Sequence, residues 1–173
     1  MTVIAWDGKT LAADKQLTIG EVKGKITKIS RGKGGELLGA AGVSAICVDL
    51  VKWYNDGCAA RNFPKMYDDQ LAYLLVITPW SGIYLYYASE DYVHLSDNDI
   101  FAIGSGADYA IGAMRAGADA VRAVEIASEF STSCGGGVDT LELPPLEEDS
   151  KYYELIKKPK KTTKSLKKNY KLA

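Results

Sequence analysis

The opening of the chain, MTVIAWDGKTLAADKQ, constrains the fold more than any other part of the sequence. It contains two short apolar segments, TVIAW and KTLAA, on either side of Asp7-Gly8. An Asp-Gly pair between two such segments is a strong signal for a β-hairpin with a two-residue turn. The chain therefore begins with an antiparallel pair of strands rather than with a βαβ unit.

The rest of the sequence alternates short strands with segments of helical periodicity. We expect strands in ELLGAAGV, AYLLVIT, GIYLYYA, YVHL, DIFAI and GGGVDTLEL, and helices in SAICVDLVKWYND, ADYAIGAMRAG and DAVRAVEIASEF, with Ser44 and Ser105 as capping residues. Hairpins with helices grouped between them predict α+β layers. The residues expected to be buried in the sheets are Ile4, Leu11, Leu38, Val76, Ile77, Leu85, Ile103 and Val138.

Composition excludes several classes of protein. The 173 residues suffice for one domain with a sizeable core, and no apolar run approaches the ~18 residues that span a bilayer. We expect no secretory signal, because the first residues do not form a charged region, an apolar region and a small-residue cleavage site. The three cysteines (Cys47, Cys58 and Cys134) form no CxxC pair, which favours a reducing, cytoplasmic compartment over a disulfide framework. With His94 as the only histidine, we expect no metal site, and no motif indicates a cofactor.

Charge divides the chain into a body and a basic end. Residues 157–171 contain eight lysines and no acid, which leaves 13 basic residues against 22 acidic ones elsewhere, a balance near −9. We expect a domain over residues 1–143, an acidic and proline-containing linker over 144–156 and a flexible Lys-rich tail over 157–173 that is dispensable for the fold. The tail also gives a weak indication of binding to a nucleic acid or an acidic surface.

The start of the sequence also fits one kind of catalyst. An N-terminal threonine can use its hydroxyl as the nucleophile and its own α-amine, with a reference pKa near ~8, as the base. A lysine held by a carboxylate would lower the pKa of that amine, and a backbone N–H would stabilise the oxyanion. This chemistry needs a terminal threonine with lysine and aspartate at the ends of neighbouring strands.

Each part has a candidate in the sequence. Thr2 becomes terminal if Met1 is removed, Asp14 ends the second strand, Lys28 lies in ITKIS, Gly42 precedes a helix, and Ser105 lies in a Gly-Ser-Gly turn. Each also has a structural interpretation. Asp14 is a common turn former, Lys28 is one of several neighbouring basic residues, and Ser105 is a suitable helix cap.

The order TVIA…DG…LAAD, ITKI, LLGAAG, DIFAIGSGADYAIGAM and GGGVDTLEL resembles the proteasome β-subunit and HslV group of N-terminal nucleophile hydrolases over residues 2–143, in a small form like those of bacteriophages. The resemblance implies a four-layer αββα sandwich of antiparallel sheets, an oligomer that forms rings, self-processing, and hydrolysis of peptide or amide bonds. It implies that Thr2 is nucleophile and base, Asp14 and Lys28 the charge pair, Gly42 the oxyanion donor and Ser105 an auxiliary hydroxyl. It leaves open whether an unfoldase partner exists.

Two departures keep an inactive assembly subunit open as the alternative. In STSCGGG, Ser131 and Cys134 stand where the pattern has Asp and Ser. In addition, a turn at Asp7-Gly8 places Thr2 opposite Ala13 and Met1 opposite Asp14, so that Thr2 and Asp14 face opposite sides of the sheet. A three-residue turn or a bulge would bring them to one face.

Overall fold

A computed structural model describes residues 2–67, 70–79, 82–95 and 100–143 of the chain. Met1 and residues 144–173 lie outside the described residues. The predicted removal of Met1, the linker over 144–156 and the tail over 157–173 therefore stay predictions.

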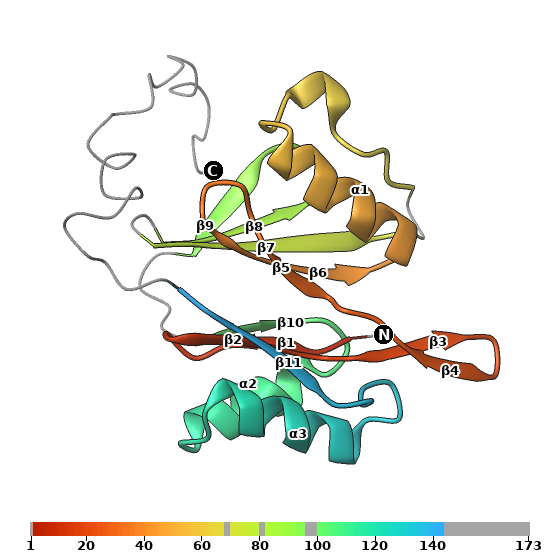
Figure 1. Ribbon diagram of the computed structural model, residues 1–173, viewed down its shortest axis with the longest axis vertical. Helices are drawn as coiled ribbons and strands as arrows, with labels where there is room; N and C mark the ends of the chain where they lie inside the picture. The colour runs from red at the N-terminus through yellow and green to blue at the C-terminus, as the bar shows by residue number, and fades with distance from the viewer. Residues whose placement is uncertain (1, 68–69, 80–81, 96–99, 144–173) are drawn as a thin grey trace, which may run out of the picture.

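The described chain folds into four layers, as predicted (Figure 1). One helix covers the outer face of a five-stranded sheet, the inner face of this sheet packs on a four-stranded sheet, and two further helices cover the far side. All the strand pairs in the described residues are antiparallel. The αββα sandwich is thus confirmed.

The four-stranded sheet carries the start of the chain in its middle. Its order is β10-β1-β2-β11, with β1 at Ile4–Trp6, β2 at Thr10–Asp14, β10 at Phe101–Ile103 and β11 at Val138–Glu142. Strand β1 is therefore bonded to a neighbour on both sides, which fixes the backbone just after Thr2.

The five-stranded sheet has the order β5-β6-β7-β8-β9. Its strands are β5 at Ile29–Arg31, β6 at Leu37–Gly42, β7 at Ala72–Thr78, β8 at Gly82–Tyr87 and β9 at Tyr92–Leu95. Strands β3 (Gln16–Ile19) and β4 (Val22–Lys25) form a separate hairpin that extends beyond the body of the molecule (Figure 1).

The helices bury apolar faces against the two sheets. Helix α1 (Ser44–Asn55) packs on the five-stranded sheet and is followed by a short 3-10 turn, η1 (Ala60–Asn62). Helices α2 (Ala107–Arg115) and α3 (Ala120–Phe130) pack on the four-stranded sheet. Both faces of β1 and β2 are consequently buried, which explains why these strands are apolar at nearly every position.

Most of the predicted core residues are buried. Ile4, Leu11, Leu38, Val76, Ile77 and Ile103 are at most 6% exposed. Leu85 and Val138 are half-buried and pack against the edges of two core clusters.

The first turn differs from the prediction by one position. Trp6 lies opposite Leu11, and the Asp7 N–H lies 3.4 Å from the Thr10 oxygen, so the turn residues are Gly8 and Lys9. The Asp7 carboxylate accepts hydrogen bonds from the backbone N–H groups of Lys9 and Thr10, which places Asp7 before the turn rather than in it. Gly8 then supplies the positive φ of 96° that the first turn position requires.

Both predicted serine caps are wrong. Helix α1 begins at Ser44 itself, with Val43 as N-cap and no side-chain cap. The N-cap of α2 is Gly106, because the hydroxyl of Ser105 is used by Thr2 instead. The helix that does have a side-chain cap is α3, where the Asp119 carboxylate accepts the Arg122 N–H.

The outer surface of the helical layer carries aromatic side chains. Tyr109 on α2 and Phe130 on α3 are 48% and 68% exposed, and their rings stack with centroids 6.2 Å apart.

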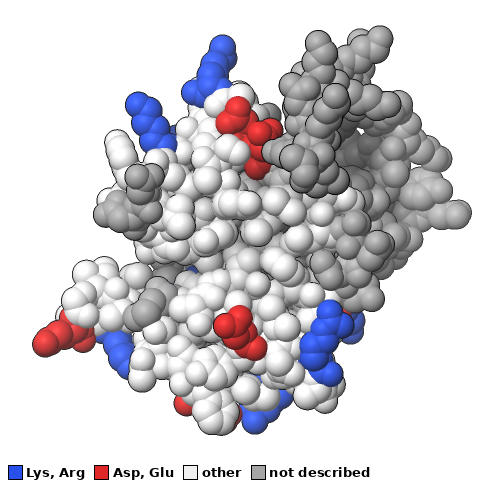
Figure 2. Space-filling model, turned by 180° about the vertical axis from the view of Figure 1, so that it is seen from behind, with Lys and Arg blue, Asp and Glu red and all other residues white. Residues whose placement is uncertain are grey.

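Charged side chains are sparse on the face of the molecule shown in Figure 2, which views the layers from the side. No helix in the described part of the chain is long and apolar enough to cross a membrane.

Candidate active site

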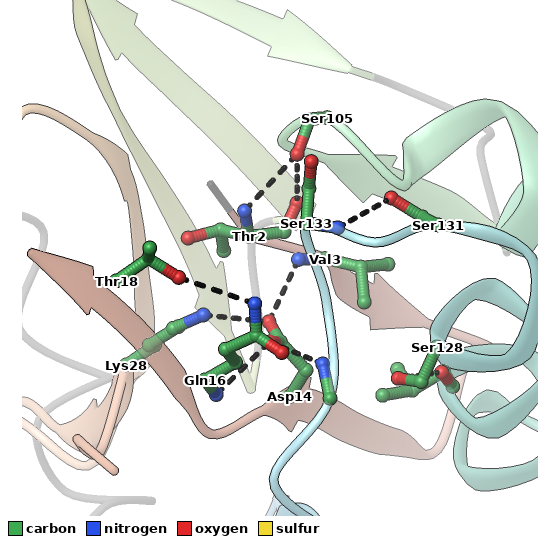
Figure 3. Close-up of polar contacts among 12 residues, drawn as sticks. Thr2, Val3, Asp14, Gln16, Thr18, Lys28, Ser105, Ser128, Ser131 and Ser133 are labelled. Carbon is green, nitrogen blue, oxygen red and sulfur yellow. Dashed lines mark hydrogen bonds and ion pairs between the residues drawn. The ribbon is translucent and has the colours of Figure 1, made fainter. Parts of the chain in front are cut away.

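Asp14 is the structural centre of the site. It ends β2 and is fully buried, and its two oxygens accept four hydrogen bonds (Figure 3). Oδ1 accepts the Val3 N–H at 2.9 Å and the Lys28 ammonium at 2.7 Å. Oδ2 accepts the Gln16 N–H at 3.1 Å and the Gly135 N–H at 3.0 Å. The three backbone donors stabilise the buried charge and prevent the carboxylate from rotating.

Lys28 precedes β5 and is held by this carboxylate. Its side chain is 7% exposed and forms a buried ion pair with Asp14. A buried ion pair of this kind is costly to break from one side only, because the remaining charge is left uncompensated. The buried carboxylate of Asp14 therefore fixes the position of the Lys28 ammonium.

Thr2 is held by Ser105, which lies in the turn between β10 and α2. The Thr2 N–H donates to Ser105 Oγ at 3.2 Å, and the Ser105 hydroxyl donates to the Thr2 carbonyl oxygen at 3.4 Å. The Gly106 N–H donates to the same carbonyl oxygen at 3.1 Å. These hydrogen bonds hold both the nitrogen and the carbonyl oxygen of Thr2. The residue is also buried, with 6% of its surface exposed.

Thr2 and Asp14 occupy opposite faces of the sheet. Ile4 pairs with Ala13, and the Asp14 N–H donates to the Val3 oxygen, so Asp14 lies opposite Val3 rather than opposite Met1. Alternation then puts Asp14 on the face of Val3, and Thr2 on the face of Ile4. The predicted pairings were wrong, and the bulge thought necessary for the site is not there.

Two cavities meet at Thr2. The first, which we call the lysine-side cavity, has a volume of about 290 Å³ and is lined among others by Lys28, Gly42, Cys47 and Val51. The second, the serine-side cavity, has a volume of about 630 Å³ and is lined among others by Gly42, Tyr73, Leu85 and Ser105. Thr2 and Gly42 line both cavities, so they form the boundary between them.

The Gly42 N–H is directed toward the lysine-side cavity. The Val43 N–H donates to the Leu71 oxygen just before β7, and the Ala40 N–H donates to the Lys28 oxygen on the β5 side. Because successive N–H groups of a strand point to alternate neighbours, the Gly42 N–H points to the β5 side, just beyond Lys28. Gly42 has a φ of 127°, and an added Cβ would lie 2.3 Å from the Leu71 oxygen.

The five predicted residues are thus brought together around Thr2, and two more were missed. Gln16 and Gly135 donate to Asp14, and the Gln16 side chain also donates to the Thr132 oxygen at 3.0 Å. The glycine run at 135–137, with positive φ at each position, gave a signal for unusual backbone. Nothing in the sequence distinguished Gln16 from other polar residues.

The cysteines near the site are protonated thiols at neutral pH. Burial raises the pKa of Cys47, which lines the lysine-side cavity, to about 11. Burial, together with the negative charge of Asp14, also raises the pKa of Cys134. Neither is therefore suited to act as a nucleophile. The described residues hold no group of three or more metal-binding side chains.

Comparison with solved structures shows where this fold is found. HslV from Trypanosoma brucei superposes with a TM-score of 0.62 at 22% identity, covering 82% of this chain and 98% of HslV. BPH from Thiobacillus denitrificans superposes with a TM-score of 0.62 at 24% identity, covering 84% of this chain and 100% of BPH. The complex of BPH with Epoxomicin gives 0.62 at 22% identity.

No family model and no curated protein matches the sequence. At these identities the structural likeness establishes the fold alone. The chain therefore has the fold of the HslV- and proteasome-like N-terminal nucleophile hydrolases.

Proposed function

We propose that the chain is an N-terminal threonine hydrolase that cleaves peptide or amide bonds. The observation that carries the proposal is the placement of Thr2. Its backbone nitrogen is held by Ser105 at 3.2 Å, and it lines one cavity with Lys28, whose ammonium is fixed at 2.7 Å from Asp14. A site of this kind supplies a nucleophile, a base and a positive charge in one place.

The proposed reaction begins once Met1 has been removed and the nitrogen of Thr2 is a free amine. The amine takes the hydroxyl proton of Thr2 while Oγ attacks the carbonyl carbon of the substrate. The Gly42 N–H and the Lys28 ammonium stabilise the negative charge that develops on oxygen. Asp14 acts as a positioning residue, because it holds Lys28 and the Val3 N–H without lining either cavity.

The test is a matched pair of substitutions at Thr2. Thr2→Val keeps the shape of the side chain and removes the hydroxyl, whereas Thr2→Ser keeps the hydroxyl. We expect Thr2→Val to lower hydrolysis of a fluorogenic peptide library by at least about 10³-fold, and Thr2→Ser to retain part of it. Thr10→Val, a threonine away from both cavities, serves as the control.

Intact mass measured on the same samples decides between the proposal and its alternative. The active protein should lack Met1. A protein that retains Met1 and shows no hydrolysis would be an inactive assembly subunit, as the second hypothesis holds. A solved structure holds BPH in complex with Epoxomicin, so binding of this compound is a further measurement to compare between native protein and Thr2→Val.

We also propose that the chain assembles with copies of itself through its helical layer. The support is the exposed stacked pair Tyr109 and Phe130, since large exposed aromatic groups favour a protein contact. Phe130→Glu should shift the oligomer toward smaller species in sedimentation velocity. A ring arrangement and a cytoplasmic location are further parts of this proposal.

A further inference from the structure

The serine-side cavity lies beside Thr2 and has a composition suited to an apolar ligand. Its volume of about 630 Å³ falls in the range of small-molecule and peptide sites. Its apolar lining includes Val43, Leu71, Tyr73, Leu85 and Ile103, and none of its described lining residues is charged. The described lining of this cavity is thus uncharged, whereas the neighbouring lysine-side cavity contains Lys28.

The mouth of this cavity exposes apolar side chains. Val43 and Leu71 are 37% and 46% exposed, and the Val43 N–H donates to the Leu71 oxygen at 3.2 Å, which fixes them side by side. Apolar groups held rigidly at the entrance of an apolar cavity lose contact with water when a ligand is bound.

The two cavities differ in which catalytic group they contain. Ser105, which holds the nitrogen of Thr2, lines the serine-side cavity and not the other, and Lys28 lines the lysine-side cavity and not this one. The nitrogen of Thr2 carries the proton that must be delivered to the departing amine. The departing amine is therefore expected on the side of Ser105, and the acyl half of the substrate on the side of Lys28.

We propose that the serine-side cavity binds the leaving-group half of a peptide or amide substrate and selects an apolar first residue there. This inference rests on the proposed function. Oγ of Thr2 forms a bond to the carbonyl carbon, and its proton passes to the Thr2 amine. The carbon–nitrogen bond breaks as the same proton passes to the leaving nitrogen in this cavity. Water then hydrolyses the ester to the acid and restores the hydroxyl.

The experiment compares internally quenched peptides that share one acyl half and differ in the first leaving-group residue. We expect kcat/KM for leucine or phenylalanine to exceed that for aspartate or lysine by at least about 10-fold, since burying an unpaired charge is costly. Leu71→Lys adds a charge at the exposed mouth. It should raise cleavage of the aspartate peptide relative to the leucine peptide by about 3- to 10-fold.

Val48→Lys is the matched control. Val48 is 64% exposed and lines the lysine-side cavity only. This variant should change the preference for the acyl half and leave the ratio of leaving-group peptides unchanged. A Leu71→Lys protein whose oligomeric state changes, with no change in that ratio, would mean that the cavity is an interface between copies and would overturn the proposal.

A peptide with a coumarin amide as leaving group separates the two ideas. If native protein cleaves it through Thr2 but cleaves all the quenched peptides at similar rates, the leaving-group proposal is wrong and the proposed function stands. If no substrate is cleaved, or if cleavage survives Thr2→Val, the proposed function fails and this inference falls with it.

Discussion

Gly104 offers a direct test of how tightly Thr2 must be held. It precedes Ser105 and has a φ of 96°, and an added Cβ would lie 2.2 Å from the carbonyl oxygen of Thr2 and 2.8 Å from its carbonyl carbon. Real Cβ contacts essentially never fall below 3.0 Å, so Gly104→Ala must push the two segments apart by about 0.8 Å, from 2.2 to 3.0 Å. The neighbouring atoms belong to backbone, which cannot rotate away.

Gly117 provides a matched control for the backbone strain. Its φ is 102°, close to that of Gly104, but an added Cβ there meets nothing within 4 Å. Gly117→Ala should therefore cost about 1–2 kcal/mol of unfolding free energy from strain alone, a fall of about 3–6 °C in melting temperature. Gly104→Ala should cost roughly 1–3 kcal/mol more, because it adds a steric clash.

Hydrolysis should separate the two variants more sharply than stability does. A misplacement of the nucleophile approaching 1 Å costs on the order of 10²-fold in rate. We expect kcat/KM to fall by about this factor in Gly104→Ala and to stay within about 2-fold of native in Gly117→Ala, measured well below both melting temperatures. Equal activities, with Gly104→Ala properly folded, would refute the argument that Ser105 and its turn position Thr2.

Three further predictions follow from the described contacts. Asp14→Asn should lower the free energy of unfolding, measured by chemical denaturation, by about 3–5 kcal/mol. The double mutant with Lys28→Met should lose less than the sum of the two single losses. Additive losses would show that the two residues are not coupled. Burial raises the pKa of Asp7, but backbone hydrogen bonds in its turn and from the start of α3 outweigh burial and leave this pKa below its usual value. The stabilisation by Asp7 should therefore be complete above the unfolded pKa and be lost as the pH falls through the folded one. Urea unfolding of native protein and Asp7→Asn between about pH 5 and pH 2 should converge, and parallel curves would contradict this. Because burial raises the pKa of Cys47 to about 11, its alkylation by iodoacetamide at neutral pH should be far slower than that of a free thiol, as measured by mass spectrometry.

The layers of the fold could be predicted from the sequence because the strands are short, apolar and separated by clear turns. Asp14, Lys28 and Gly42 could be identified because each stands at or beside a strand end, where side chains of neighbouring strands meet. The position of the first turn could not be predicted from the sequence, since it depends on the hydrogen bonds that the Asp7 carboxylate accepts. The Asp7 carboxylate also accepts the Ala120 N–H at 2.8 Å, a contact between segments far apart in the chain.

The role of Ser105 shows why a local signal can mislead. A serine before a helix normally caps it, and the sequence suggested a second role for Ser105 only as an auxiliary hydroxyl beside Thr2. In the fold, the start of the chain lies beside this turn, and the Ser105 hydroxyl exchanges hydrogen bonds with Thr2 instead. The same long-range effect explains Gln16 and Gly135, whose backbone N–H groups matter only because Asp14 is buried between them.

The location of Asp14 on the opposite face from Thr2 explains how a buried acid can serve this site without entering it. Oδ1 binds Lys28 and the N–H of Val3, the residue bonded to the carbonyl of Thr2. The carboxylate thus positions both the lysine and the backbone that follows Thr2, while Ser105 positions the backbone nitrogen of Thr2 itself. This placement leaves Thr2, Lys28 and Gly42 to line one cavity, where the proposed reaction uses Lys28 and Gly42 to stabilise the oxyanion.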